Sequence, residues 1–579
     1  MTRSNNREVN VKLIGRFMIA AIFPALLAGN SVAQQMDGNK TRQAVVTATG
    51  TTGAFSTAVN GSASENNKAS EPSERERLLL ERIEKLEQRL AGLESRSAVK
   101  PASESVQPAD VTKATSSPTA LAKPEDVKAT SPAEAGTLNL DATVASAPGA
   151  PLSQTNESRK KEPFAFADFT WLTGSSRQKE YPLKFSDIFT GELRVDAAFH
   201  HSFNRPKDNT ISGSTEVFRS GEVQLTDLAI GGDFNYKNVR ARLLTQFGMY
   251  SQTQPRNDAS PGRGQWNLDN AYRYVSEAYG GYHIDKLNGI NIDAGIFLSY
   301  IGLDSFYQFD NWSYQPSYVS SNTPWYFQGV RVQIFLSDKL KIEPWIINGW
   351  QSYGKFNRAP GVGGQVLWRP NGSVSIVANN YWGTDTLGNP DRKRIHTDDS
   401  IQVKYLDSPE SKLSKAAFTF TLDGGCEYGG GVSCNGGTPD KPSQYFLGFM
   451  AYNRLWFHKD LFALTLGGGA ITNPGRYLVL IPPINGATAF SGTPYFTAGP
   501  GDKFRAWDTS ATFDYMPTQF STFRIEYNHR AANVPYFSGR EGVTPPGGNT
   551  GAPGSFVLGF APDLRKYERR FTIALLIKL

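Results

Sequence analysis

From about residue 186 onward, the chain alternates hydrophobic and polar residues with a period of two. In GELRVDAAFHH, Leu193, Val195 and Phe199 share one face, whereas Arg194 and Asp196 share the other. Successive side chains of a strand point to opposite faces, so such a segment has one apolar and one polar surface. The pattern recurs in VRARLLTQFGM from residue 239 and in STFRIEYNHR from residue 521. One face suits hydrocarbon and the other suits water.

Sixteen segments of this kind are predicted as strands. They lie near 190–203, 222–235, 239–252, 271–284, 290–302, 323–336, 339–352, 362–369, 373–382, 398–406, 415–423, 443–457, 460–472, 504–515, 521–531 and 567–579. Short connections such as YKN (236–238) and HKD (458–460) alternate with long polar ones, which favours a transmembrane barrel over a soluble sandwich. Pro344 lies inside one of these segments and predicts a bulge or a shorter strand there.

The predicted fold is all-β: a transmembrane antiparallel β-barrel of about 16 strands, preceded by a short N-terminal coiled-coil helix and a disordered linker. The expected parts are a signal peptide (1–33), a disordered N-terminal segment (34–73), a coiled coil (74–96), an Ala/Ser/Pro-rich linker (97–163), a segment at the barrel mouth or in the lumen (164–185) and the barrel (186–579). Residues 164–185 could also hold an uncounted strand. The linker composition is too poor in apolar residues to fold by itself.

The first 33 residues have the pattern of a secretory signal peptide. Four basic residues precede an apolar run over 17–28, and the small residues SVA end at Ala33, so cleavage is expected before Gln34. A membrane anchor is the alternative, but the run is shorter than the roughly 20 residues that span a bilayer. Removing four basic residues and one acid lowers the formal charge from +6 to +3. Charge therefore gives no support for a nucleic-acid partner.

A heptad pattern over residues 74–96 predicts a parallel coiled coil and hence a homo-oligomer. The seam positions are Leu79, Ile83, Leu86, Leu90 and Leu93. Arg82 stands five residues before Glu87, and the same spacing recurs one heptad later, as ion pairs between parallel helices require. A single amphipathic helix packed on its own protein is the alternative.

The two cysteines, Cys426 and Cys434, lie in a glycine-rich stretch. In an exported protein we expect them to form a disulfide, which would contribute at most roughly 3 kcal/mol for so short a ring. No metal site is expected, because two thiolates with no nearby histidine make a poor zinc site. No cofactor is expected either.

Enzyme motifs are absent from the sequence: there is no HExxH, GxSxG or P-loop spacing. His396 beside Asp398 and Asp399 is the nearest candidate for an outer-membrane hydrolase, and a polar loop or lumen cluster is the alternative. The basic run in NPDRKRIHTDD (389–399) suits either a lipopolysaccharide phosphate or plain solvation. We expect a protein that is not an enzyme.

Several stretches resemble the OmpL-like β-barrel porins of Gram-negative bacteria. They are PFAFADFTWLTGSSR from residue 163, GIFLSYIGLDSFYQFDNWSYQPSYVSSNTPWYFQGVRVQ from residue 295 and NNYWGTDTLGNPDRKRIHTDDSIQVKYLD from residue 379. The resemblance implies an outer-membrane pore over about 163–579, in contact with lipid and lipopolysaccharide, and supplies no catalytic residues. A structural or adhesive anchor with a plugged barrel is the rival hypothesis.

The polar face of the barrel would line the channel for small hydrophilic solutes. The pore-lining candidates are Arg194, Asp196, Arg240, Arg242, Arg331, Lys341, Glu343, Lys404, Arg524 and Glu526. Basic residues outnumber acidic ones in this set, which predicts a mild anion preference.

The stretch DSFYQFDNWSYQPSYVSS (304–321) holds six aromatic residues in the third long loop. By analogy with sixteen-stranded general porins, we expect this loop to fold into the lumen. The constriction candidates are Asp304, Tyr307, Asp310, Trp312 and Tyr314. The rings either pack against the wall or face the channel and stack on sugars, and packing is favoured because large rings usually serve burial.

Overall fold

The computed structural model describes residues 162–579 except 175–177, 215, 256–257, 475–502 and 549–556. The predicted signal peptide, N-terminal segment and coiled coil, and nearly all of the linker, lie outside the described residues. No helix in the described ranges is long and apolar enough to cross a membrane.

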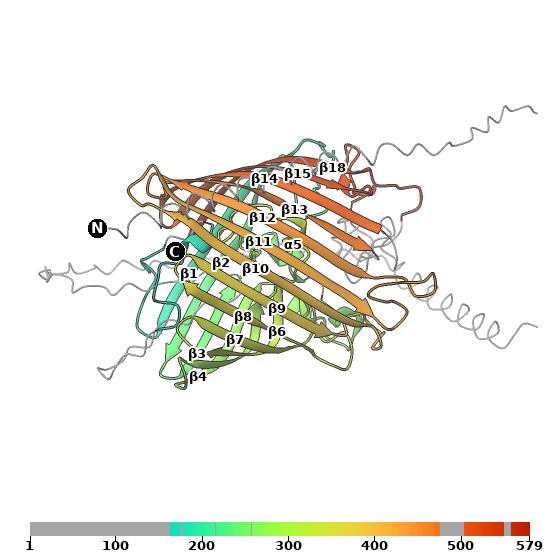
Figure 1. Ribbon diagram of the computed structural model, residues 1–579. Helices are drawn as coiled ribbons and strands as arrows, with labels where there is room; N and C mark the ends of the chain where they lie inside the picture. Colours follow the sequence, from blue (N-terminus) through green and yellow to red (C-terminus); the bar gives the residue numbers. More distant parts are fainter. Residues whose placement is uncertain (1–161, 175–177, 215, 256–257, 475–502, 549–556) are drawn as a thin grey trace, which may run out of the picture. The chain divides into compact units, whose positions relative to one another are not determined.

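Sixteen antiparallel strands of the described chain close into a barrel, as predicted (Figure 1). They are β1 (Phe189–Ser202), β2 (Val223–Tyr236), β3 (Val239–Thr245), β4 (Val275–Ile284), β5 (Ile290–Leu298), β6 (Tyr326–Phe335), β7 (Leu340–Ile347), β8 (Gly361–Asn371), β9 (Val374–Gly383), β10 (Lys393–Asp407), β11 (Leu413–Tyr428), β12 (Tyr445–Phe457), β13 (Phe462–Pro474), β14 (Lys503–Thr518), β15 (Ser521–Ala532) and β18 (Tyr567–Lys578). The barrel closes where β1 pairs with β18, with Arg194 opposite Lys578.

The connections are short at one end of the barrel and long at the other. The short turns include residues 237–238, 336–339 and 372–373. We call the long loops L1 to L8 in chain order; L1 spans 203–222, L3 spans 299–325 and L8 spans 533–566. The short turns of such barrels face the periplasm.

Small elements occur in the segments between the barrel strands. They are the 3-10 helix η1 (Thr170–Leu172) before β1, α3 (Tyr250–Thr253), η3 (Ser260–Gly262) and α4 (Leu268–Tyr272) in L2, α5 (Tyr318–Ser321) in L3, and the two-stranded sheet of β16 (Phe537–Ser538) and β17 (Leu564–Arg565) in L8. Thr170–Leu172 is a helical turn, so the described part of 164–185 adds no barrel strand.

Several strand boundaries differ from the prediction; β3 and β7, for example, are both shorter than expected. β3 ends at Thr245 rather than near 252, because Gly248 takes a positive φ of 94° and the chain turns into α3. Pro344 lies inside β7 without a register shift. The β6–β7 pairing is interrupted between Arg331 and Ile334, where proline offers no N–H to the ladder.

The outer surface of the barrel is apolar. Ile230, Leu243 and Leu466 are each about half exposed on outward-facing positions. A soluble protein rarely exposes so continuous an apolar surface, whereas a membrane barrel requires one. Exposed aromatic residues mark both ends, with Trp368 near the short turns and Tyr567 near the long loops. These are the two aromatic girdles of a membrane-spanning band.

Candidate pore and the chain that fills it

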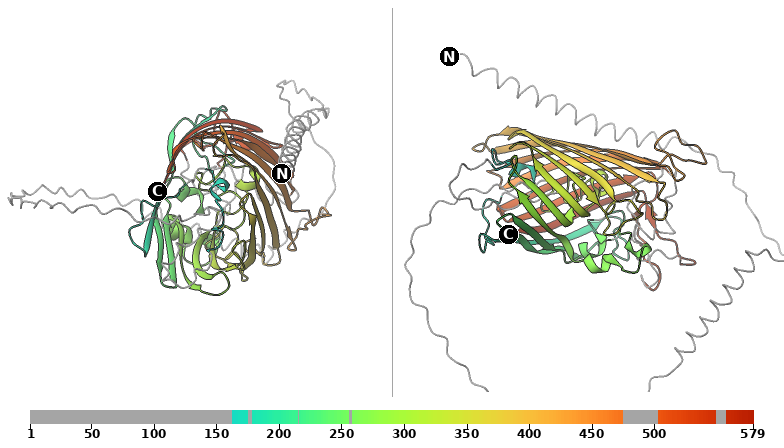
Figure 2. Two further views of the ribbon diagram at one scale, coloured as in Figure 1. Left: turned by 60° about the vertical axis from the view of Figure 1, so that its left-hand side comes forward. Right: turned by 90° about the horizontal axis from the view of Figure 1, so that it is seen from below.

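The inward face of the barrel wall is charged and buried. Nine of the ten predicted pore-lining residues are less than 9% exposed, with Glu343 and Arg524 at 0%. Lys404 is the exception; its ammonium lies 5.8 Å from the centroid of the Trp171 ring. Inserted parts of the chain cover this wall, as the view along the barrel shows (Figure 2).

Ion pairs neutralise most of these charges within the wall. Arg242 contacts Glu192 at 2.7 Å, Asp233 at 2.8 Å and Glu277 at 3.0 Å. Four strands further along the wall, in β7, Lys341 pairs with Glu343. The acidic partners outside the predicted set were missed, although period-two alternation also places them on the polar face.

L3 lies inside the barrel. Every residue from 299 to 327 is buried except Asp304 and Asp310, which are partly exposed. The wall binds the main chain of the loop: the Glu526 carboxylate accepts the N–H groups of Tyr314 at 2.5 Å and Gln315 at 2.9 Å. Four predicted pore-lining residues contact the loop in this structure: Arg194, Asp196, Arg524 and Glu526.

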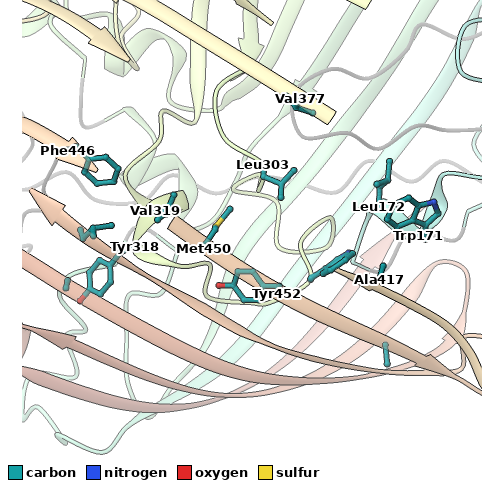
Figure 3. Close-up of a cluster of buried hydrophobic side chains, with 14 of the residues drawn as sticks. Trp171, Leu172, Leu303, Tyr318, Val319, Val377, Ala417, Phe446, Met450 and Tyr452 are labelled. Carbon is teal, nitrogen blue, oxygen red and sulfur yellow. The ribbon is translucent and has the colours of Figure 1, made fainter. Parts of the chain in front are cut away.

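The aromatic rings of L3 pack against the wall. Trp312 makes an edge contact with Trp456 at 5.7 Å between ring centroids, and it belongs to the buried cluster in Figure 3. The Tyr314 hydroxyl lies 3.0 Å from Asp196 Oδ1 and 3.0 Å from Thr226 Oγ1. In this structure, these two rings pack against the barrel wall rather than face an open channel.

Three more predicted L3 residues are held in place by this packing. The Arg194 guanidinium lies 4.0 Å above the Tyr307 ring and donates to Asp310 Oδ2 at 2.8 Å. Asp304 lines a small enclosed cavity beside Trp312. The constriction candidates therefore share one region of the lumen.

Residues 163–174, which we call the mouth segment, lie across the periplasmic end of the lumen. The Phe164 N–H donates to Asp338 O at 2.8 Å in one periplasmic turn, and Trp171 Nε1 donates to Gly372 O at 3.1 Å in another. Trp171 and Leu172 are buried in the same cluster as L3 (Figure 3). The Gly174 N–H donates to Asp310 O at 2.8 Å, so the segment ends against L3.

The mouth segment separates two hollows. On its inner side, Leu172 lines a cavity of about 40 Å³ together with Trp312 of L3. On its outer side, Asp168 and Thr170 line an open vestibule of about 500 Å³ bounded by periplasmic turns. Burial acts to raise the pKa of Asp168, but hydrogen bonds from the Thr170 hydroxyl and N–H outweigh it and lower that pKa.

His396 does not sit with both predicted aspartates. Alternation along β10 places Asp399 on the exposed outer face, where it accepts from the Thr397 hydroxyl at 3.1 Å. The His396 Nε2 instead lies 2.6 Å from Asp423 Oδ1 of β11, and both side chains are fully buried. The Asp399 part of the hydrolase hypothesis is therefore wrong. No group of metal-ligating residues was found in the described chain.

Cys426 and Cys434 form a disulfide with a Cα–Cα distance of 5.1 Å. It joins the end of β11 to L6. In the basic run, Arg392 donates to Gly430 O at 2.9 Å and Arg394 donates to Glu427 at 2.9 Å. These two guanidinium groups bind neighbouring chain in this structure.

Comparison with known proteins places the barrel in a family. The family model described as "Putative beta-barrel porin-2, OmpL-like" matches residues 189–560, which is more than half of the chain. No curated protein sequence matches this chain.

Among solved structures, the chain is similar to OmpT of Vibrio cholerae in its trimer form (9% identity, 68% of this chain and 99% of that chain, TM-score 0.37). It is also similar to the outer membrane channel DcaP of Acinetobacter baumannii (11%, 68% and 97%, 0.38) and to an anion-selective porin from Comamonas acidovorans (8%, 68% and 99%, 0.39). These likenesses are too remote to support a functional argument. The family match covers β1 to β15, and this chain belongs to the OmpL-like β-barrel porin family of the outer membrane.

Proposed function

We propose that this porin lets small hydrophilic solutes diffuse passively through its barrel, and that the structure describes its closed state. The observation that supports this most is the charged inward face of the wall, covered by L3 and the mouth segment rather than by an apolar core. A barrel of 16 strands is wide enough for an aqueous channel once such inserts move. The surplus of basic pore-lining candidates favours a mild anion preference.

A plugged structural anchor is the second candidate. The burial of nearly all of L3 favours it, because a permanent plug would be packed in the same way. Yet buried ion pairs add little stability to a permanent plug, because burying the charges costs desolvation energy and apolar residues could replace them. The ion pairs of the wall therefore favour a channel over an anchor.

Conductance distinguishes the two candidates. Full-length folded protein is inserted into planar bilayers, both as wild type and as the double variant Trp312→Ala/Tyr314→Ala, and ion current is recorded. A porin gives discrete openings in at least one of the two, and liposomes that contain it swell with small sugars. Current at the lipid background from both forms would contradict the porin and support the anchor.

We also propose that the signal peptide directs export and that the coiled coil at 74–96 joins several copies in the periplasm. The heptad seam and its charge spacing support this proposal. Chemical crosslinking in native membranes should capture oligomers that disappear when Leu86 and Leu90 are replaced by aspartate. Unchanged oligomers would contradict it.

A further inference from the structure

The main chain at Gly174 lies close to two arginine side chains of the wall. Arg454 Nη2 donates to the Gly174 carbonyl oxygen. Arg524 Nη2 donates to Asn311 O of L3 at 2.9 Å and lies 3.1 Å from where a Cβ of residue 174 would be. Both guanidinium groups are fully buried. The carbonyl group of the mouth segment thus occupies a place that faces two cations.

The two guanidinium groups share a single hydrogen-bonded carboxylate among the described residues. Asp514 is bound by both arginines, at 2.8 Å from Arg454 Nη1 and at 2.7 Å from Arg524 Nε. Their other hydrogen-bond partners in the described chain are neutral: Thr465 Oγ1, Met516 Sδ and main-chain carbonyl oxygens of L3 and residue 174. Glu526 and Asp196 act on Arg524 through their charge, without a hydrogen bond to it. Guanidinium groups bind carboxylate and phosphate oxygens more strongly than neutral carbonyls.

We propose that Arg454 and Arg524 form an anion-binding site at the periplasmic mouth, which the Gly174 carbonyl occupies in the closed barrel. When the mouth segment leaves, the site binds the carboxylate or phosphate group of an anionic solute. This inference rests on the proposed porin function and deepens it, because it assigns the solute class and the residues that select it.

The position of the site supports this role. The mouth segment lies between the vestibule of about 500 Å³ and the inner cavity of about 40 Å³. Arg454 lies between the two hollows, because its guanidinium group contacts Met516, which lines the vestibule, and the carbonyl oxygen of Trp312, which lines the inner cavity. A solute leaving the lumen would then pass the paired guanidinium groups.

Gly174 offers a precise way to displace the segment. A Cβ at this residue would lie 1.8 Å from Asn311 O, so alanine cannot fit without a main-chain shift. Gly372 gives a second variant at the other end, where a Cβ would lie 2.8 Å from the Ala167 Cβ. Gly280 in β4 is the matched control, because an added Cβ there meets nothing within 4 Å.

The test uses full-length protein in planar bilayers. Gly174→Ala should raise the fraction of time that the channel is open by about tenfold, the scale that overpacking of a tight contact produces. Gly372→Ala should act in the same direction, and Gly280→Ala should match the wild type. Heat-dependent mobility on gels confirms that each variant forms a barrel.

Inorganic phosphate then probes the site in the Gly174→Ala background. Phosphate on the periplasmic side should block chloride current. Adding Arg454→Gln should raise the half-blocking concentration by about tenfold, as expected for losing a charged hydrogen bond. Lys459→Gln, which removes an exposed charge at the same mouth, should leave the block unchanged.

The outcomes separate this inference from the porin function. If wild type already conducts as well as both alanine variants, the porin stands and the occupied site is contradicted. The anion-binding site is also contradicted if phosphate blocks Gly174→Ala equally well after Arg454→Gln is added. It is contradicted as well if phosphate does not block Gly174→Ala at all. If no form conducts, the porin function itself fails.

Discussion

Glu526 binds two N–H groups of L3 with one carboxylate and also accepts the Thr512 hydroxyl at 2.8 Å. Glutamine in its place keeps one acceptor oxygen, but its NH₂ group would face an N–H group of Tyr314 or Gln315 and could not accept its hydrogen bond. We expect Glu526→Gln to destabilise L3 locally by about 1–3 kcal/mol, the cost of leaving a buried amide unsatisfied.

Hydrogen–deuterium exchange measures this effect. The amides of Tyr314 and Gln315 should exchange at least about tenfold faster in Glu526→Gln. Glu410→Gln, in an exposed periplasmic turn, is the control and should change nothing. Equal protection in both variants would show that the wall carboxylate does not hold the loop.

Asp208 joins L1 to L8 at the outer mouth and predicts a pH effect. Its carboxylate accepts the N–H groups of Val543 and Thr544, each at 2.8 Å, and the Thr544 hydroxyl at 2.7 Å. Burial acts to raise its pKa, but the Thr544 hydroxyl and these N–H groups outweigh burial and lower the pKa below its ordinary value of 3.8.

A lowered folded pKa means that this contact stabilises the loops fully above the ordinary pKa and is lost as the pH falls through the folded value. Below about pH 4, the amides of Val543 and Thr544 should exchange roughly fivefold faster than the change in the intrinsic exchange rate alone predicts. The expected effect is small because Asp208 is partly exposed and solvent screens its interactions. Asp208→Asn should show the faster exchange already at pH 7. Exchange independent of both pH and the substitution would contradict the contact.

At the scale of elements, L3 is inserted into the lumen, and the packing of its aromatic rings determines how firmly the wall holds it. Trp312→Ala/Tyr314→Ala removes the edge contact to Trp456 and the hydrogen bond to Asp196. Each truncation of a buried aromatic side chain costs about 3–5 kcal/mol, enough to free the loop. We expect a larger single-channel conductance, measured in planar bilayers. Trp266→Ala, at a 76% exposed residue of L2, is the control. Unchanged conductance would place L3 outside the conducting path.

The strands could be predicted because lipid on one side and polar groups on the other impose a period of two along the wall. Boundaries were less predictable. The alternation continues only to about residue 249, where Gly248 turns the chain away from the sheet. The lumen position of L3 was expected by analogy, but the contacts that hold it could not be predicted, because pairs such as Arg524 with Asn311 join residues far apart in sequence. Alternation alone predicts that Arg524 faces inward, but it does not predict which residues Arg524 contacts.

At the scale of the whole molecule, the barrel combines a polar wall with inserted chain that forms hydrogen bonds and ion pairs with this wall. Arg194 of β1 illustrates the arrangement: it pairs with Asp310 of L3 at 2.8 Å and lies 4.0 Å from the Tyr307 ring centroid. In a permanently dry core, such ion pairs would cost desolvation energy. In a wall that becomes hydrated when the channel opens, the same charged side chains can face water. The central claim is therefore that a closed porin, rather than a plugged anchor, carries these inserts.

The most direct test is the single-channel current of full-length wild type and of Gly174→Ala in the same planar bilayers. We predict rare openings from wild type and an open fraction about tenfold higher from Gly174→Ala, because the added Cβ displaces the mouth segment. Currents at the lipid background from both proteins, with both shown to be folded barrels, would contradict the account.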